Sequence, residues 1–259
     1  MSVNNLVLPV LMYHGIHDTV NDEGLFDSTY SLSRKNFKAH LSWLFNHGYQ
    51  TVAFDCLPDT LLEKSVVVSF DDGDISNYTV AYFALLEVGY RGEFYITTDR
   101  IGHAGSMSKN QIRDMADNGM SIQSHGVTHK FLSDLKYDDL YRELYESKDI
   151  LEQITGKSVN VLALPGGRGN SRVVKLALEL GYKIICTSIM GHNHMPIDHA
   201  AIKRLSIYRD TNVSNFRSLV MASGRYYNKS LLKQRILVVP KMVLGNNLYF
   251  KIRKIMLDG

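Results

Sequence analysis

Two adjacent aspartates, Asp71 and Asp72, follow an apolar run in the segment SVVVSFDDGD. Neighbouring side chains at the end of a strand point in different directions, so one carboxylate can bind a metal ion while the other accepts a proton. In parallel α/β barrels the chemistry lies at the C-terminal ends of the strands, where this pair is expected. An Asp-Gly pair is also a frequent turn sequence, and the segment alone leaves that structural interpretation open.

A pair of histidines, His125 and His129, follows another strand-like run in SIQSHGVTHKFL. In an extended chain these residues would lie about 13 Å apart at about 3.3 Å per residue, too far to share one ion. In a helical turn their Cβ atoms approach to about 5–6 Å. If both are ligands, the chain must turn after Ser124, and Gly126 permits such a turn. Surface histidines on a helix would show the same spacing.

Two imidazoles and one carboxylate form an open ligand set that leaves positions for water and substrate. A metal ion in such a site, with Zn²⁺ the expected one, lowers the pKa of water and polarises a carbonyl group, which indicates hydrolysis. His14, in the segment MYHGI, ends the first predicted strand on the same side of the fold. It either faces this pocket or hydrogen-bonds to the loop that follows.

Short β-rich runs that alternate with amphipathic stretches must position these groups. Caps and terminators predict helices from Ser33 to Gly48, from Ser108 to Gly119, over 138–155 and over 171–180. The alternation predicts an α/β fold, a distorted (β/α) barrel of seven or eight strands. Strands are predicted at 7–12, 50–54, 65–70, 92–96, 121–124, 161–164, 184–187 and 202–207.

Composition limits the classes of partner and compartment. The net charge of +3 is spread over the 259 residues, which argues against nucleic acid as a partner. Cys56 and Cys186 both lie in apolar runs without CxxC spacing, so they are predicted to be buried free thiols, in keeping with a reducing compartment. The N-terminal residues lack the pattern of a signal peptide, and cytoplasmic location is expected.

The C-terminal residues differ in character from the rest. We predict a catalytic domain over residues 1–222 and a basic amphipathic appendage over 223–259. The appendage either makes peripheral contact with an anionic membrane or packs on the barrel as a helix with a solvated face. Its basic residues include Lys233, Arg235, Lys241, Lys251, Arg253 and Lys254.

The segments SFDDG (69–73) and, more loosely, HGVTH (125–129) resemble two motifs of the NodB-type polysaccharide deacetylases, carbohydrate esterase family 4. The resemblance extends over about residues 7–220. It implies a distorted (β/α) barrel and metal-dependent removal of acetyl groups from an N-acetylated sugar. It also implies that Asp71 is the catalytic base and that Asp72, His125 and His129 bind the metal.

A third motif of that family, Arg-x-Pro-aromatic-Gly, is altered here to ALPGG, so Ala163 stands at the arginine position. Losing a cation beside Asp71 would raise the pKa of that carboxyl group. Arg168 and Arg204 are the candidates to replace it. Arg168 and the turn formed by Pro165, Gly166 and Gly167 are also expected to contact substrate, with a backbone N–H of the turn stabilising an oxyanion.

The family's late Leu-x-His segment, which supplies the general acid, has no counterpart in this chain. We predict His194 or His192, in the segment MGHNHMP, as the acid, with a surface loop as the alternative for each. The expected substrate is a lipid-linked or otherwise immature glycan used in cell-surface or exopolysaccharide biosynthesis. A non-catalytic glycan-binding scaffold that retains the metal ligands and an O-deacetylase are the alternatives.

Overall fold

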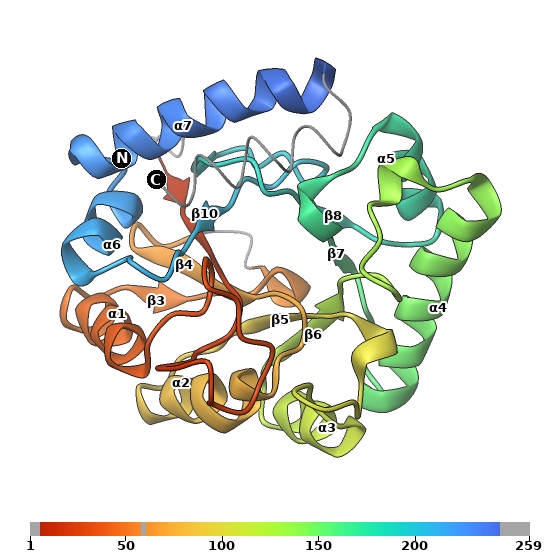
Figure 1. Ribbon diagram of the computed structural model, residues 1–259, viewed down its shortest axis with the longest axis horizontal. Helices are drawn as coiled ribbons and strands as arrows, with labels where there is room; N and C mark the ends of the chain where they lie inside the picture. The colour runs from red at the N-terminus through yellow and green to blue at the C-terminus, as the bar shows by residue number, and fades with distance from the viewer. Residues whose placement is uncertain (1–5, 58–60, 244–259) are drawn as a thin grey trace.

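Seven parallel strands form a curled sheet in the middle of the molecule, and helices surround it (Figure 1). The computed structural model describes residues 6–57 and 61–243, with side chains described up to residue 233. β3 (Gln50–Thr51) lies off this path and pairs with the start of β4. Across the sheet the strands are β10 (Leu205–Ser206), β2 (Val10–Tyr13), β4 (Ser65–Phe70), β5 (Glu93–Ile96), β6 (Ser121–Ser124), β7 (Val161–Ala163) and β8 (Ile184–Cys186).

Backbone hydrogen bonds bring the two edges of the sheet together just before β10. The N–H of Ile202 donates to the carbonyl of Ile185 at 2.9 Å, and the N–H of Thr187 donates to the carbonyl of Ile202 at 2.9 Å. Since β10 pairs with β2, these contacts nearly close the curled sheet. The predicted distorted (β/α) barrel is therefore confirmed.

A two-stranded antiparallel sheet that the sequence did not predict joins β1 (Val7–Leu8) to β9 (Asn193–His194). β1 precedes β2 along the chain, so this small sheet lies at the N-terminal end of the barrel strands. The expected strand over 7–12 is thus divided into two, and the strand expected over 202–207 is shortened to β10.

Four helices begin and end near the predicted residues: α1 (Arg34–Asn46), α3 (Lys109–Asp117), α4 (Tyr137–Thr155) and α5 (Ser171–Glu179). Ser33 caps α1 by accepting a hydrogen bond from the Asn36 N–H, and Ser108 forms a capping box with Gln111. Gly156 ends α4 with φ 66°, a left-handed conformation that glycine adopts without strain. α2 (Phe83–Glu87) and α6 (Val213–Val220) were not predicted.

The apolar core lies in two layers that follow the alternation of side chains along the strands. Outward-facing residues such as Phe70 and Phe94, whose rings stack at 4.8 Å, pack against the helices. Inward-facing residues such as Val67 and Tyr95 fill the barrel. Glu93, which is fully buried, lies next to this inner layer and accepts a hydrogen bond from the N–H of Phe54 at 2.9 Å.

The prediction of two buried thiols is half wrong. Cys186 is buried at the end of β8, but Cys56 is exposed; both are free. Cys56 ends a 3₁₀ turn, Phe54–Cys56, in which Phe54 takes the buried position, and its sulfur contacts the guanidinium of Arg91. The apolar run around Cys56 therefore reflects the burial of Phe54.

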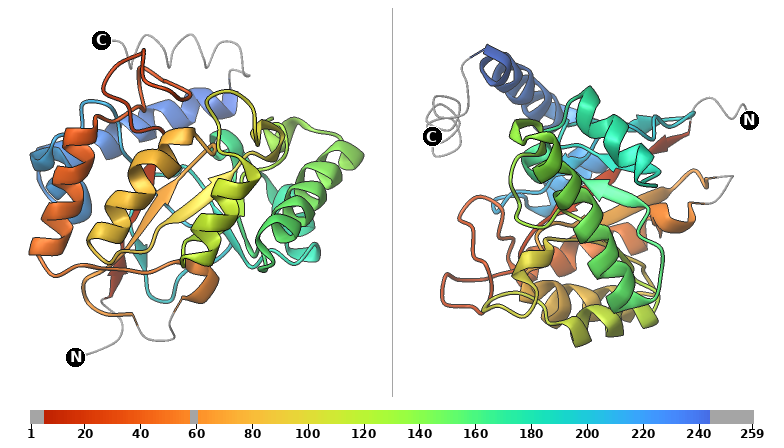
Figure 2. Two further views of the ribbon diagram at one scale, coloured as in Figure 1. Left: turned by 90° about the horizontal axis from the view of Figure 1, so that it is seen from below. Right: turned by 90° about the vertical axis from the view of Figure 1, so that its right-hand side faces the viewer.

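The last described helix, α7 (Gly224–Val243), follows α6 and runs along the side of the barrel near β10 (Figures 1 and 2). Tyr226 and Tyr227, in its first turn, pack against the outer core. The division at residues 222 and 223 stays a prediction, and residues 244–259 of the expected appendage lie outside the described residues. Within the described ranges, no helix has both the length and the apolar character to cross a bilayer.

Candidate functional site

Asp71 forms a buried ion pair with Arg204. The two guanidinium nitrogens Nη1 and Nη2 donate to Oδ1 and Oδ2 of Asp71 at 2.6 and 2.8 Å. Arg204 is 0% exposed and Asp71 3%. The Nε of Arg204 donates to the carbonyl of Thr187 at 2.8 Å, which fixes the plane of the guanidinium group. Of the two candidates for the missing cation, Arg204 therefore lies beside Asp71.

This pair determines the protonation state of the carboxyl group. Burial raises the pKa of Asp71, but the charge of Arg204, followed by that of His125, outweighs burial and holds the pKa well below its usual range. Asp71 is therefore ionised at neutral pH. Its backbone N–H donates to the carbonyl of Tyr13 at 3.0 Å, which anchors the end of β4 to β2.

Asp72, His125 and His129 place one potential ligand atom each within 4.8 Å of one another. Nε2 of His129 lies 3.2 Å and Nε2 of His125 lies 3.8 Å from Oδ1 of Asp72. Ligands held about 2.0–2.1 Å from a tetrahedral zinc ion lie about 3.3 Å apart, so these separations are close to those of a binding site.

The chemistry of the donor atoms also fits a metal. Oδ1 of Asp72 is buried and accepts no hydrogen bond from the described residues, although Nη1 of the partly exposed Arg100 lies 3.3 Å away. Nδ1 of His125 lies 2.8 Å from the carbonyl of Ala163, a contact that assigns the ring proton to Nδ1 and leaves the Nε2 lone pair for a ligand bond. Burial lowers the pKa of His125 to about 4, so the ring is neutral, as metal binding requires.

The backbone turns sharply at both metal-facing segments. Asp72 has φ 77° and His129 has φ 61°, a left-handed conformation that non-glycine residues seldom adopt. Gly126, with φ 77°, makes the turn that the two histidines require. Strain of this kind persists only where surrounding contacts enforce it.

Glu143 of α4 enforces the turn between the histidines. Its carboxylate accepts hydrogen bonds from the N–H groups of Val127 and Thr128 at 2.7 and 3.0 Å, and from the Thr128 hydroxyl. This residue was missed in the sequence, although a carboxylate among Leu140, Leu144 and Ser147 on the buried face of α4 was a signal.

A second group missed in the sequence holds the loop after β2. Asp74, two residues after Asp72, lies 3.3 Å from Nε2 of the fully buried His17 and accepts hydrogen bonds from the Leu25 N–H and the Ser76 N–H. This buried carboxylate ties the loop after β2 to the loop that carries Asp71 and Asp72.

His14 lies beside the aspartates. Tyr13 of β2 pairs with Phe70 of β4, so His14 and Asp71 follow side by side at the ends of neighbouring strands. Its ring stacks on Tyr30 with 4.4 Å between centroids, and its Nδ1 is buried without a hydrogen-bond partner among the described residues. The expectation that His14 faces the pocket agrees with this placement.

The turn at Pro165–Gly167 follows β7 directly, next to His125. Gly166 and Gly167 have φ 60° and 64°, and a Cβ at Gly167 would lie 2.5 Å from Cβ of Ser188. The N–H of Gly167 donates to Leu164 and that of Arg168 to Pro165, so these amides are engaged within the turn. The guanidinium of Arg168 lies over the Phe131 ring, 4.6 Å from its centroid.

His192 and His194 lie away from Asp71 and the proposed metal ligands. His194 pairs with Val7 in the small sheet, six residues before Tyr13, which corresponds to roughly 20 Å along the strand direction from the end that carries Asp71. His192 is buried, with Nε2 at 3.2 Å from the carbonyl of Val220 and Nδ1 at 3.2 Å from the Tyr227 hydroxyl. The placement of both histidines contradicts the predicted role of general acid.

Comparisons with known proteins agree with this fold. A family model for polysaccharide deacetylase matches residues 59–185. The chain is 31% identical over 193 residues to YxkH of Bacillus subtilis strain 168, which is provisionally named a polysaccharide deacetylase. That alignment covers 71% of this chain and 65% of YxkH, so the chain spans slightly less than two thirds of this relative.

Two solved structures are similar over most of the chain. BC0361, a polysaccharide deacetylase from Bacillus cereus, has a TM-score of 0.76 and 30% identity over 83% of this chain and 69% of that one. Streptococcus pyogenes deacetylase PplD, solved in complex with acetate, has a TM-score of 0.75 and 25% identity over 83% and 99%. The sequence and the fold together show that this chain belongs to the polysaccharide deacetylase family.

Proposed function

We propose that this protein is a metal-dependent deacetylase that removes acetyl groups from an N-acetylated saccharide. The observation that carries the proposal is the arrangement of an ionised, arginine-paired Asp71 next to the ligand group Asp72, His125 and His129. A base beside an open metal site is the arrangement that amide hydrolysis requires.

Asp72, His125 and His129 would hold the divalent metal, for which we propose Zn²⁺. The ion, when bound, supplies a Lewis acid that polarises the acetamide carbonyl and activates water. The hydrogen bond between His125 and Ala163 and the brace from Glu143 keep the two imidazoles in position.

Asp71 accepts the proton of the attacking water. Arg204 keeps the carboxylate ionised and holds both of its oxygens, and Oδ2 lies 3.9 Å from Nε2 of His125, on the side of the proposed metal ligands. The Gly166 N–H is the donor we propose for the developing oxyanion, because Pro165 has no N–H and the next two amides are engaged within the turn.

His14 replaces His192 and His194 as the proposed general acid. Protonation of the leaving amine needs an imidazole within reach of the reacting atoms. His14 and Asp71 follow the paired residues Tyr13 and Phe70, and Nδ1 of His14 has no hydrogen-bond partner among the described residues. The stack on Tyr30 holds the ring in place.

The proposed substrate is an acetylated glycan of cell-surface or exopolysaccharide biosynthesis, including lipid-linked forms. PplD, solved with acetate, supports the acetyl group of this substrate, because acetate is the product of deacetylation. Two free cysteines are consistent with the cytoplasm as the place of the reaction. Contact of the C-terminal segment with a membrane is also part of the proposal.

Acetate release from an N-acetylglucosamine oligomer tests the function. Asp71→Asn should abolish release while zinc binding persists, because the metal ligands are left in place. Asp117→Asn, an exposed carboxylate on α3, is the matched control and should retain activity. Full activity of the Asp71→Asn variant would refute the assignment of the base.

The alternative of an inactive glycan-binding scaffold depended on the missing motif arginine and on the missing general acid. Arg204 supplies the cation to Asp71, which removes the first of these two grounds, and the proposed role of His14 addresses the second. An O-acetylated substrate in the same acetate assay distinguishes an O-deacetylase from the proposed N-deacetylase.

A further inference from the structure

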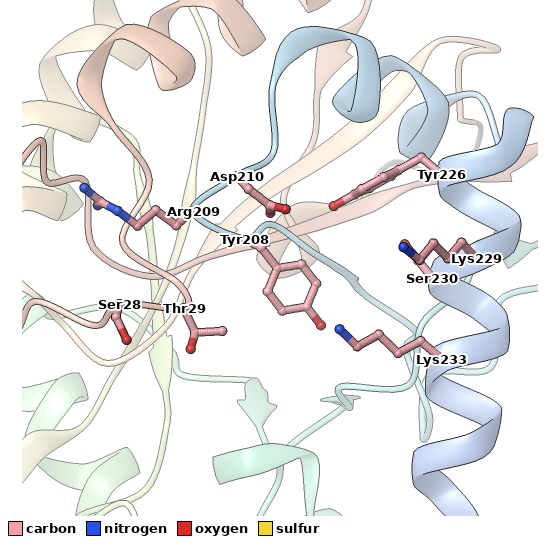
Figure 3. Close-up of a pocket in the computed structure, with 9 residues that line it drawn as sticks. All are labelled: Ser28, Thr29, Tyr208, Arg209, Asp210, Tyr226, Lys229, Ser230 and Lys233. Carbon is pink, nitrogen blue, oxygen red and sulfur yellow. The ribbon is translucent and has the colours of Figure 1, made fainter. Parts of the chain in front are cut away.

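A pocket of about 480 Å³ lies between α7 and the loops that follow β2 and β10 (Figure 3). Both loops leave the C-terminal ends of their strands, the end of the barrel at which Asp71 lies. The volume is within the range of about 300–1,000 Å³ that is typical of small-molecule sites. The pocket is lined by Ser28, Thr29, Tyr208, Arg209, Asp210, Tyr226, Lys229, Ser230 and Lys233.

A row of stacked rings connects this pocket to the candidate active site. His14 stacks on Tyr30 at 4.4 Å, and Tyr30 stacks on Tyr208 at 5.4 Å between ring centroids. Tyr208 in turn lines the pocket. Aromatic rings present flat apolar surfaces with a polar edge, a form that suits the faces and hydroxyls of sugar rings. The row therefore leads from the proposed acid into the pocket.

The pocket carries excess positive charge. Lys229 and Lys233 project from α7, and Figure 3 shows the Lys233 ammonium group directed towards the hydroxyl of Tyr208. Neither lysine forms an ion pair with the residues that the structure describes. Asp210 is the one carboxylate among the lining residues, and it lies near the hydroxyl of Tyr226.

Arg209 also lines the pocket, but Figure 3 shows its guanidinium group directed away from the two lysines. Its guanidinium donates to the backbone carbonyls of His17, Ser31 and Asp18, at 3.3, 2.9 and 2.8 Å. These acceptors are uncharged, so they fix the side chain without cancelling its charge. Lys229 is exposed and Lys233 is half-buried, and both lack an acidic partner in the described residues. Lysines of this kind beside a pocket attract an anionic ligand.

From this geometry we propose that the pocket binds a phosphate group of the substrate, on an acetylated saccharide whose acetamide reaches Asp71. This inference rests on the proposed deacetylase function. The sugar next to the reacting one would lie along Tyr30 and Tyr208, and its phosphate would contact Lys229 and Lys233. Hydroxyls of Ser28, Thr29 and Ser230 offer further donors for phosphate oxygens.

The pocket fits a phosphate carried by a saccharide better than the lipid headgroups of a membrane surface. The cations lie in a pocket whose aromatic lining continues to the proposed acid, whereas contact with a lipid surface needs only an exposed basic face. Binding of the phosphate would thereby position the acetamide of the substrate at Asp71. Loss of this contact should raise KM more than it changes kcat.

The test compares a neutral N-acetylglucosamine oligomer with the same oligomer carrying a phosphate at its reducing end. Wild-type protein should show a KM about tenfold lower for the phosphorylated oligomer, as expected for hydrogen bonds to a charged group. Lys229→Gln/Lys233→Gln should bring the two KM values together. Lys35→Gln/Lys38→Gln, with the same charge change on the exposed face of α1, should leave their ratio unchanged.

Calorimetric binding of N-acetylglucosamine 1-phosphate separates this inference from the proposed function, because binding needs no turnover. Loss of binding in Lys229→Gln/Lys233→Gln, with binding kept in the α1 control, supports the phosphate site even if acetate is never released. Equal binding by wild type and the pocket variant overturns it. Dependence on the two lysines only for vesicles containing phosphatidylglycerol would also overturn it, in favour of a membrane contact.

Discussion

Replacing Arg204 with methionine removes the buried cation that faces Asp71 while keeping most of the side-chain volume. The carboxylate would remain 3% exposed without its two hydrogen bonds at 2.6 and 2.8 Å. Removing one partner of a buried ion pair destabilises a protein by about 3–5 kcal/mol. Arg204→Lys keeps the charge but loses the paired geometry, so a smaller loss of about 1.5–3 kcal/mol is expected.

Urea unfolding measures these differences, with the single tryptophan, Trp43, as the fluorescent probe. Trp43 lies on α1 and packs against Phe216, with 5.9 Å between ring centroids, far along the chain from the substitution. A chelator in every sample removes metal ions, so differences in metal affinity between the variants do not contribute to the measured stabilities. The double variant Asp71→Asn/Arg204→Met should be more stable than Arg204→Met alone, because it no longer buries an unpaired charge.

The lowered pKa of Asp71 also predicts how the difference in stability between Arg204→Met and the wild type changes with pH. In the wild type the lowered pKa of Asp71 stabilises the fold above the unfolded value of about 3.9, and this contribution is lost as the pH falls through the folded value. Without Arg204, burial remains and raises the pKa, so Arg204→Met should gain stability relative to wild type as the pH falls towards 4. An Arg204→Met protein within about 0.5 kcal/mol of wild type at pH 7 would refute the reasoning.

Three further perturbations address separate parts of the structure. Burial raises the pKa of Glu93 to about 8, so wild-type stability should fall as the pH rises from about 4 through 8, and Glu93→Gln should flatten thermal melting between pH 5 and 9. Glu143→Gln should weaken zinc binding about 10–100-fold by calorimetry, whereas Glu146→Gln, at a partly exposed position on the same helix, should not; equal affinities would contradict the bracing role. Gly167→Ala should lower the free energy of unfolding by about 1–3 kcal/mol in urea, because its Cβ would overlap Ser188, and an unchanged midpoint would contradict this.

Local sequence signals predicted the elements that carry the ligands. β4 and β6 were predicted to the residue, because the first is a short β-rich run bounded by polar residues and the second ends at the His125 turn. The four cap and terminator patterns located their helices because side-chain caps act within one turn. Asp71, Asp72, His125 and His129 come together because their strands are parallel and end on one side.

Residues whose positions depend on contacts between distant parts of the chain were harder to predict from the sequence. Arg204 lies 133 residues from Asp71, and no local pattern distinguished it from Arg168. His192 and His194 were misplaced because the pairing of β1 with β9 involves two residues on each strand, too few for a periodic pattern. Cys56 was misplaced because its neighbour Phe54 accounts for the apolar run.

The ionisation of Asp71 depends on Arg204, which lies where the two edges of the barrel sheet meet. Arg204 follows Ile202, whose hydrogen bonds with β8 join the sheet edges, and its Nε donates to Thr187 just after β8. The family model matches residues 59–185, which include the proposed base and ligands but neither Arg204 nor His14. Those two come from the regions of β10 and β2, which pair with each other. A span that includes His14 and Arg204, longer than the matched region, is therefore needed for the proposed chemistry.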